Sequence, residues 1–230
     1  KDDHSGIDKP AAIIFETVQA EGGVNVSSIN WMQRLSDLCK RYKILLICDD
    51  IQVGCGRTGS FFSFERAGII PDIVVLSKSI SGYGLPMSIL LIKPGLDIWE
   101  PSEHNGTFRG NQLAFVGATA ALEYWITANL EQEVKRKEKI VKRKLEQGLG
   151  NQPDFICVRG IGLIWGIDLS KLQKSDISLE VIRRCYEKGL ILESVGRNNS
   201  VIKILPALTI EDNLLEKGLD IVVSVLKNIV

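Results

Sequence analysis

Short apolar runs and one helical stretch alternate along the first half of the chain. In residues 28–42 the apolar positions recur at three-residue spacing behind Ser28, whose hydroxyl can cap a helix, so an amphipathic helix is predicted there. The apolar runs lack a regular polar face, which is typical of strands covered on both sides in a parallel sheet. They lie at residues 11–15, 44–48, 72–77 and 87–92. Strand, helix and strand in this order predict an α/β architecture.

The second half of the chain has a different pattern. A single long helix is predicted for residues 111–149, where small apolar residues come first and a dense run of charges, typical of a solvated face, follows. Beyond it we expect strands near 155–158, 163–169 and 190–192, a helix near 179–188 and a last helix from Glu211. The chain is therefore predicted to form two domains, residues 1–130 and a small α+β domain at residues 131–230.

The charge balance narrows the possible partners. Lys and Arg together number 28, as do Asp and Glu, so the formal net charge is zero. Nucleic acids and anionic membrane surfaces select proteins with a positive excess, so neither is expected as a partner. No apolar run reaches the length of a membrane span. Because the chain begins with Lys and not Met, we expect it to be part of something longer.

Cysteine and histidine usage gives two further expectations. The five cysteines are scattered and form no C-x-x-C pair, a usage that fits a reducing compartment, so a cytoplasmic location is expected. With two histidines in the whole chain, a zinc site of histidines and cysteines is not expected, and no metal ion is assigned.

Candidate chemistry lies where two of the predicted strands end. The strand at 44–48 is followed by Asp49, and the strand at 72–77 is followed by Lys78 in a loop of small residues that lets a ligand approach the backbone. In an open parallel sheet, ligands bind beyond the carboxyl ends of the strands. A carboxylate and an amine at one edge of the sheet are therefore candidates for catalysis. From this pattern alone, a surface lysine and a capping aspartate are the favoured interpretation.

A glycine-rich segment offers a competing interpretation. Residues 54–59 match the G-x-G-x-x-G pattern of dinucleotide-binding loops. That fingerprint directly follows its strand and opens a helix. Here residues 50–53 come between, and an aromatic-rich segment at 61–64 follows. A structural loop is the favoured interpretation, and a nicotinamide-binding domain remains a distant alternative.

Four longer motifs occur along the chain in a fixed order. They are E-T-V-Q-A-E-G-G at 16–23, D-D-I-Q-V-G followed by G-R-T-G at 49–59, P-D-I through S-K-S-I-S-G at 71–82, and G-T-F-R-G-N at 106–111. Together they resemble the class III aminotransferases, which are pyridoxal-phosphate enzymes of fold type I. The resemblance implies that residues 1–130 are the C-terminal part of the large, mostly parallel-sheet cofactor domain, and that residues 131–230 are the small C-terminal domain.

The resemblance also implies roles for four residues. Lys78 would bind the aldehyde of pyridoxal 5'-phosphate covalently, and Asp49 would keep the pyridinium nitrogen protonated. Gln52 would donate a hydrogen bond to the phenolic oxygen of the cofactor. Thr107 would reach the phosphate from the partner subunit, so a homodimer or higher oligomer with shared sites is implied.

Two further residues bear on substrate choice. In relatives, a Glu at the position of Glu21 can pair with an Arg near the C-terminus, and in this chain Lys203 stands at the place of that Arg. A lysine cannot make the planar two-point grip of a guanidinium. We therefore expect a Glu21–Lys203 pair that screens the cation until 2-oxoglutarate arrives. The alternative is that Lys203 is a surface charge at a strand edge.

The finer detail of the motifs resembles the diaminobutyrate–2-oxoglutarate aminotransferases, which feed ectoine and some siderophore pathways. Asp50, where most relatives have Glu, is one such detail. The implied reaction transfers the terminal amino group of 2,4-diaminobutyrate to 2-oxoglutarate, which leaves as glutamate. Two alternatives stay open: another class III ω-aminotransferase of the ornithine, acetylornithine or 4-aminobutyrate type, and a catalytically incomplete aminotransferase-like domain.

Overall fold

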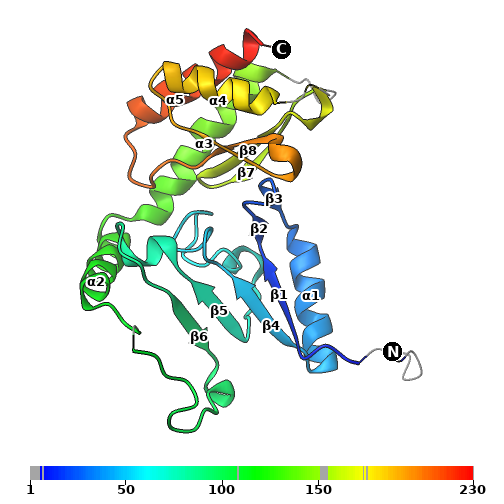
Figure 1. Cartoon of the computed structure of the whole chain (residues 1–230), viewed down its shortest axis with the longest axis vertical. Helices are drawn as coiled ribbons and strands as arrows, with labels where there is room; N and C mark the ends of the chain where they lie inside the picture. Colours follow the sequence, from blue (N-terminus) through cyan, green and yellow to red (C-terminus); the bar gives the residue numbers. More distant parts are fainter. Residues whose placement is uncertain are drawn as a thin grey trace.

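The first part of the chain forms a four-stranded sheet in the order β1-β4-β5-β6 (Figure 1). The computed structural model describes residues 6, 8–107, 109–150, 155–172, 174 and 176–229. β1 and β4 pair in parallel, as do β4 and β5, which confirms the α/β architecture. The strands of this sheet are β1 (Ala12–Glu16), β4 (Leu45–Asp49), β5 (Ile73–Leu76) and β6 (Ile89–Ile92).

Strand β6 differs from the expectation, because it runs antiparallel to β5. Parallel neighbours need a long crossover, usually through a helix. The connection at residues 77–88 contains only a short 3-10 turn, Lys78–Ser81, so the chain returns directly and β6 must run the other way. The interpretation of residues 87–92 as one more parallel strand was therefore wrong, although the apolar run does form a strand.

Helix α1 (Ile29–Tyr42) connects the hairpin of β2 (Val18–Gln19) and β3 (Asn25–Val26) to β4 and packs against the sheet. The hydroxyl of Ser28 accepts a hydrogen bond from the backbone N–H of Trp31 at 3.2 Å, which confirms the predicted cap. At the other end, Lys43 adopts a left-handed conformation and its N–H bonds to the carbonyls of Cys39 and Lys40. The buried face of α1 joins the core of the first part, which includes Met32, Leu46 and Leu76.

The long helix expected at residues 111–149 is two helices, α2 (Gln112–Thr127) and α3 (Leu130–Leu149). They are separated at Asn129, whose φ of 50° lies in the left-handed region that breaks a helix and that asparagine tolerates better than most residues. Figure 1 shows α2 beside the first sheet and α3 running on into the second part of the chain. The break therefore redirects the chain between the two parts.

The second part contains a four-stranded antiparallel sheet in the order β7-β8-β10-β9. The sequence pattern does not predict β10, because Lys203 interrupts its apolar run, and the strand expected at 190–192 begins three residues later. The bounds are β7 (Cys157–Ile161), β8 (Ile164–Asp168), β9 (Glu193–Val195), β10 (Val201–Ile204), α4 (Ile177–Glu187) and α5 (Asp212–Lys227).

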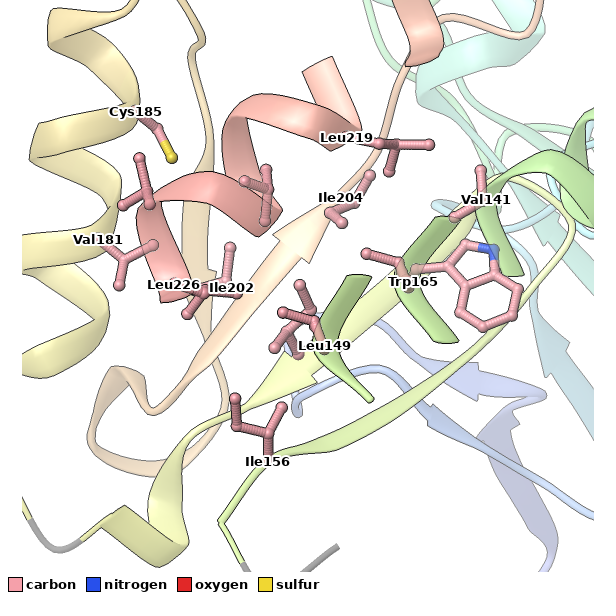
Figure 2. Packing of buried hydrophobic residues seen from close by; sticks show 14 of the residues in the cluster. Val141, Leu149, Ile156, Trp165, Val181, Cys185, Ile202, Ile204, Leu219 and Leu226 are labelled. Carbon is pink, nitrogen blue, oxygen red and sulfur yellow. The ribbon is translucent and has the colours of Figure 1, made fainter. Parts of the chain in front are cut away.

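The core of the second part lies between this sheet and helices α3, α4 and α5. Figure 2 shows side chains from these elements meeting in one cluster, among them Val141 of α3, Trp165 of β8, Val181 of α4, Ile202 of β10 and Leu219 of α5. The two helices α3 and α5 also face each other through ion pairs such as Lys144 with Asp220, at 2.9 Å. No helix of the described residues is both long and apolar enough to cross a membrane.

Arg57 fastens the first part to the second. Its buried guanidinium donates hydrogen bonds to the carbonyls of Leu163, at 3.2 Å, and of Pro206, while the N–H of Leu163 donates to the carbonyl of Arg57 at 2.9 Å. Burial lowers the pKa of Arg57 to about 10, which still leaves it cationic at neutral pH. These bonds satisfy backbone carbonyls on both sides of the junction.

Gly162, beside this junction, provides a test. Its φ is +56°, and a Cβ there would lie 2.3 Å from the carbonyl oxygen of Arg57. We expect Gly162→Ala to destabilise the protein by roughly 2 to 4 kcal/mol, because backbone strain and a backbone clash add. Gly95→Ala is the control, since nothing lies within 4 Å of a Cβ at Gly95. Equal melting temperatures for the two variants would contradict the close approach described here.

Candidate active site

The carboxyl ends of the three parallel strands meet at one edge of the first sheet. Glu16, at the end of β1, pairs with Asp49, at the end of β4. Asp49 in turn pairs with Val75 of β5, and Lys78 follows three residues later. Strand pairing therefore places a carboxylate of β1, a carboxylate of β4 and the amine after β5 at the same rim, where open parallel sheets bind ligands.

Lys78 is exposed and has a strained backbone. Its φ is 51°, a left-handed conformation that is uncommon for a residue with a side chain. The loop is fixed from both sides: the hydroxyl of Ser77 donates a hydrogen bond to the carbonyl of Met87 at 2.7 Å, and the turn Lys78–Ser81 packs against α2. Strain of this kind is retained where the surroundings impose it, and it concentrates at functional sites.

The two aspartates after β4 have different environments. Asp49 is half-buried at the rim, and its Oδ1 accepts a hydrogen bond from the N–H of Ile51 at 3.1 Å. Asp50 points into the protein, where it accepts hydrogen bonds from the N–H and the hydroxyl of Ser63. Burial raises the pKa of Asp50 to about 6 even though both hydrogen bonds act in the other direction. Asp49 therefore faces the rim, and Asp50 anchors the loop that follows.

Glu16 carries a second carboxyl group at this rim, where strand pairing places it beside Asp49. Burial raises the pKa of Glu16 above its ordinary value, and a hydrogen bond from the N–H of Ala20 opposes this shift. The negative charges of Asp49 and Glu21 raise the pKa further, and the positive charge of Lys78 lowers it.

A cleft of about 590 Å³ opens beside Lys78 and reaches the second part of the chain. Its walls carry side chains, most of them charged or polar, from five segments: the β2–β3 turn, the loop after β4, the loop after β5, strand β9, and strand β10 with the residue that follows it. The residues are Glu21, Gln52, Arg57, Lys78, Ser79, Glu193, Ser194, Lys203 and Leu205. Residues that are more than a hundred positions apart in the sequence thus share one cavity.

Lys203 is the centre of a polar cluster in this cleft. Its Nζ lies 2.6 Å from Oε1 of Glu21 and 3.0 Å from Oε2 of Glu193, and it donates to Oε1 of Gln52 at 3.1 Å. Burial opposes the charge of Lys203, but its hydrogen bonds to Glu21 and Glu193 outweigh burial and raise its pKa. The hydrogen bonds from Lys203 and Gln52 hold the pKa of Glu21 below its ordinary value.

The arrangement offers an exposed amine, a carboxylate beside it and a cluster of opposite charges across the cleft. A lysine amine is a nucleophile for carbonyl groups once it is deprotonated, and the cluster can hold a substrate by its charged end. The described residues contain no group of three or more side chains that could hold a metal ion. The chemistry available to these side chains is that of an amine and its neighbouring acids.

Comparison with known proteins identifies the family. The model of the aminotransferase class-III family matches residues 4–226. The chain belongs to the class III aminotransferases. In this chain, Lys78 follows strand β5 of the first four-stranded sheet, and the second four-stranded sheet supplies the residues across the cleft.

Curated relatives narrow the comparison. The diaminobutyrate–2-oxoglutarate transaminase of Bordetella parapertussis is 55% identical over 223 residues, which are 96% of this chain and 51% of that protein. The diaminobutyrate–2-oxoglutarate transaminase of Sporosarcina pasteurii is 52% identical over 231 residues, 100% of this chain and 54% of that protein. The chain thus spans about half the length of the curated relatives that it matches.

Solved structures share the fold. The ornithine aminotransferase of Plasmodium yoelii has a TM-score of 0.88 with 30% sequence identity, over 96% of this chain and 58% of that one. The ornithine aminotransferase of Toxoplasma gondii, whose active site is described with partial occupancy of PLP, also has a TM-score of 0.88, with 28% identity over 95% of this chain and 51% of that one. The fold of the described residues is that of pyridoxal-phosphate enzymes of this class.

The structure brings most of the candidate residues together. Lys78, Gln52, Glu21 and Lys203 line one cleft, and Asp49 lies at the neighbouring strand end. The amide of Gln52 donates a hydrogen bond to Oε1 of Glu21 at 2.9 Å. The interpretation of Lys203 as a surface charge at a strand edge was wrong, because its side chain is 2% exposed and β10 lies inside the sheet.

Thr107 and the glycine-rich segment 54–59 complete the account of the candidate residues. Thr107 is exposed on the segment before α2 and does not line the cleft, and its neighbour Phe108 in the same motif lies outside the described residues. Residues 54–59, the match to a dinucleotide-binding loop, lie in consecutive turns, and the next helical element is the short 3-10 turn Glu65–Ala67. The segment serves to hold Arg57 at the junction with the second part, in agreement with the structural-loop interpretation.

Sequence reasoning missed Glu193 and Arg57. Glu193 begins a three-residue strand and becomes significant only because β9 pairs it with Lys203. A pairing between two short strands gives no periodic signal over so few residues. Arg57 lay within a recognised motif, but its partners are backbone carbonyls, which no side-chain pattern reveals.

The raised pKa of Asp50 predicts how stability varies with pH. Because the folded state holds this proton more tightly than the unfolded state does, stability falls as the pH rises from about 4 to about 6. Asp50→Asn cannot titrate, so its stability relative to the wild type should increase over this range, by on the order of 2 kcal/mol. Melting temperatures at several pH values measure this, with Asp37→Asn on the exposed face of α1 as control. Parallel curves for wild type and Asp50→Asn would contradict the prediction.

Proposed function

We propose that the protein to which this chain belongs is a pyridoxal-phosphate-dependent transaminase that transfers the terminal amino group of 2,4-diaminobutyrate to 2-oxoglutarate. The observation that carries the proposal is the cleft in which the strained, exposed Lys78 faces the Glu21–Lys203 ion pair. Relatives named for this activity are 55% and 52% identical over almost the whole chain, which supports the choice of substrates.

The residues present fit the cofactor. Its aldehyde requires an amine, which Lys78 offers from an exposed position, and its ring nitrogen requires an acid, which Asp49 offers at the next strand end. Gln52 lines the same cleft as Lys78, and Thr107 would serve the phosphate group of a partner subunit's site. When bound, pyridoxal phosphate supplies an electron sink for the bonds of the substrate carbon.

The side chains of this chain then have separate tasks. The amine of Lys78 would move a proton from and to the substrate carbon as a general base and acid. The carboxylate of Asp49 would favour a proton on the ring nitrogen of the cofactor. Glu16, whose pKa is raised by burial, adds a second carboxyl group at the same rim.

Lys203 is suited to recognise the distal carboxylate of a keto acid. In the structure, Nζ of Lys203 donates a hydrogen bond to Oε1 of Glu21 at 2.6 Å, and Glu21 lies on the turn between the two short strands β2 and β3. If Glu21 turns away, Lys203 can bind the 2-oxoglutarate carboxylate with a charge-assisted hydrogen bond. The exposed carboxylate of Glu21 thus acts as a removable cover for the cation.

The proposal extends to the organisation of the protein. Residues 1–130 would be the C-terminal part of the large cofactor domain and residues 131–230 the small domain. Helix α2 exposes Leu113, Val116 and Ile126, an apolar surface of the kind that interfaces cover, which supports a homodimer. The five free cysteines support a cytoplasmic location.

A second candidate is an ornithine-type ω-aminotransferase. It is favoured by the solved structures that match the chain, among them the Plasmodium yoelii ornithine aminotransferase. The two candidates share Lys78 and Asp49 and differ in the length of the donor, so relative rates with 2,4-diaminobutyrate and ornithine separate them.

Covalent attachment of the cofactor tests the proposal directly. After borohydride reduction of the complete protein, mass spectrometry should find the cofactor mass on the peptide that contains Lys78. Lys78→Ala should lose this adduct and lower the transamination rate by about 10²- to 10⁴-fold, because the general base is gone. Lys93→Ala, which removes an exposed partner of Asp72, is the control. A folded wild-type protein without the adduct would favour the catalytically incomplete aminotransferase-like domain.

Lys203 gives a separate test of substrate recognition. Lys203→Ala should raise the Michaelis constant for 2-oxoglutarate about tenfold or more, since a charge-assisted hydrogen bond is lost. Lys217→Ala, at an exposed position of α5, provides the control. An unchanged Michaelis constant in Lys203→Ala would remove Lys203 from keto-acid recognition and leave the role of Lys78 intact.

A further inference from the structure

The cluster around Lys203 holds one carboxylate more than charge balance requires. Three oxygens lie within 3.1 Å of its Nζ, from Glu21, Glu193 and Gln52, which matches the three protons of an ammonium group. One cation faces two carboxylates, so the formal charge of the cluster is −1. Glu21 alone would have made the cluster neutral.

The surplus negative charge faces the cleft. The side chain of Lys203 is 2% exposed, whereas those of Glu21 and Glu193 are 67% and 69% exposed. A substrate that enters beside Lys78 therefore meets carboxylates first and cannot reach the lysine without displacing one of them. At this wall the two carboxylates favour a cation, whereas Lys78 and Arg57 supply positive charge elsewhere in the same cleft.

Glu193 is freer than Glu21 to bind a ligand. Oε1 of Glu21 accepts hydrogen bonds from both Lys203 and Gln52, which use part of its capacity to accept hydrogen bonds from a ligand. Among the described residues, Lys203 is the single ion-pair partner of Glu193. An ionised carboxylate accepts about four hydrogen bonds, so Glu193 retains acceptor capacity toward the cleft.

We propose that Glu193 is a specificity-determining residue that binds the ammonium group at the non-reacting end of the amino donor. This rests on the proposed function, since it concerns the donor of that reaction. Glu193 then selects donors with two amines: the terminal amine reacts at Lys78, and the second ammonium group binds across the cleft. Because Glu193 also stays on Lys203 when Glu21 turns away, the lysine keeps a counterion throughout the exchange of donor for acceptor.

Two substrates that differ by a single group isolate this role. 2,4-Diaminobutyrate and 4-aminobutyrate carry the same reacting amine and carboxylate, and only the former has the second ammonium group. In the complete holoenzyme, Glu193→Gln should lower the ratio of kcat/KM for 2,4-diaminobutyrate to that for 4-aminobutyrate about tenfold or more, mainly through KM, because a charged contact is lost. Glu193→Asp keeps the charge and should restore part of the preference.

Controls separate recognition from stability. Glu187→Gln removes an exposed carboxylate of α4 that pairs with Arg183 outside the cleft, so it should leave the ratio unchanged. Binding of 2-aminobutyrate, which keeps the second ammonium group but lacks the reacting amine, should weaken in Glu193→Gln when measured by calorimetry.

The outcomes distinguish this inference from the proposed function. An equal loss with both amines in Glu193→Gln, or unchanged binding of 2-aminobutyrate, would show that Glu193 serves only as a counterion of Lys203 and would overturn the inference. A wild-type holoenzyme that reacts with neither amine would instead overturn the proposed function. A selective loss with 2,4-diaminobutyrate, partly restored in Glu193→Asp, would support Glu193 as the second contact of the donor.

Discussion

The ion pair between Lys203 and Glu21 spans the two parts of the molecule, and the polar lining of the cleft is built around it. Lys203 belongs to an inner strand of the second sheet, and Glu21 belongs to a turn of the first part, so their contact at 2.6 Å links the two walls of the cleft. A buried ammonium group is costly unless its protons are satisfied, and three oxygens satisfy them here. Packing alone would join the two parts, but this contact determines which charges face the cavity.

Lysine in place of the arginine expected from relatives changes what the pair can do. A guanidinium would hold a carboxylate through two parallel hydrogen bonds in one plane, whereas an ammonium group distributes its bonds over three directions. Lys203 uses those directions for acceptors on three different segments. A single carboxylate is therefore easier to exchange, because the remaining two acceptors keep the cation in place.

The sequence predicted the elements that carry strong local signals. The apolar runs predicted strands β4 and β5, and Ser28 predicted the start of helix α1. The positions at which the strands end led to Asp49 and Lys78 as candidate site residues. The direction of β6 was not predictable from its composition, because an apolar run has the same pattern in a parallel and in an antiparallel strand. The length of the connection before β6 determines which of the two directions the strand takes. Asn129 breaks a helix through one backbone angle that neighbouring residues do not reveal.

The hydrogen bonds of Arg57 have a consequence for the dimensions of the cleft. The loop that holds this side chain comes from the first sheet, and the carbonyls that it binds belong to the segments before β8 and after β10. These hydrogen bonds therefore fix the separation between the cavity wall that carries Lys78 and the wall that carries Glu193. The cleft then selects amino donors by the number of methylene groups between their two ends. A donor that is one carbon too long or too short must bend or leave one of its charges unpaired.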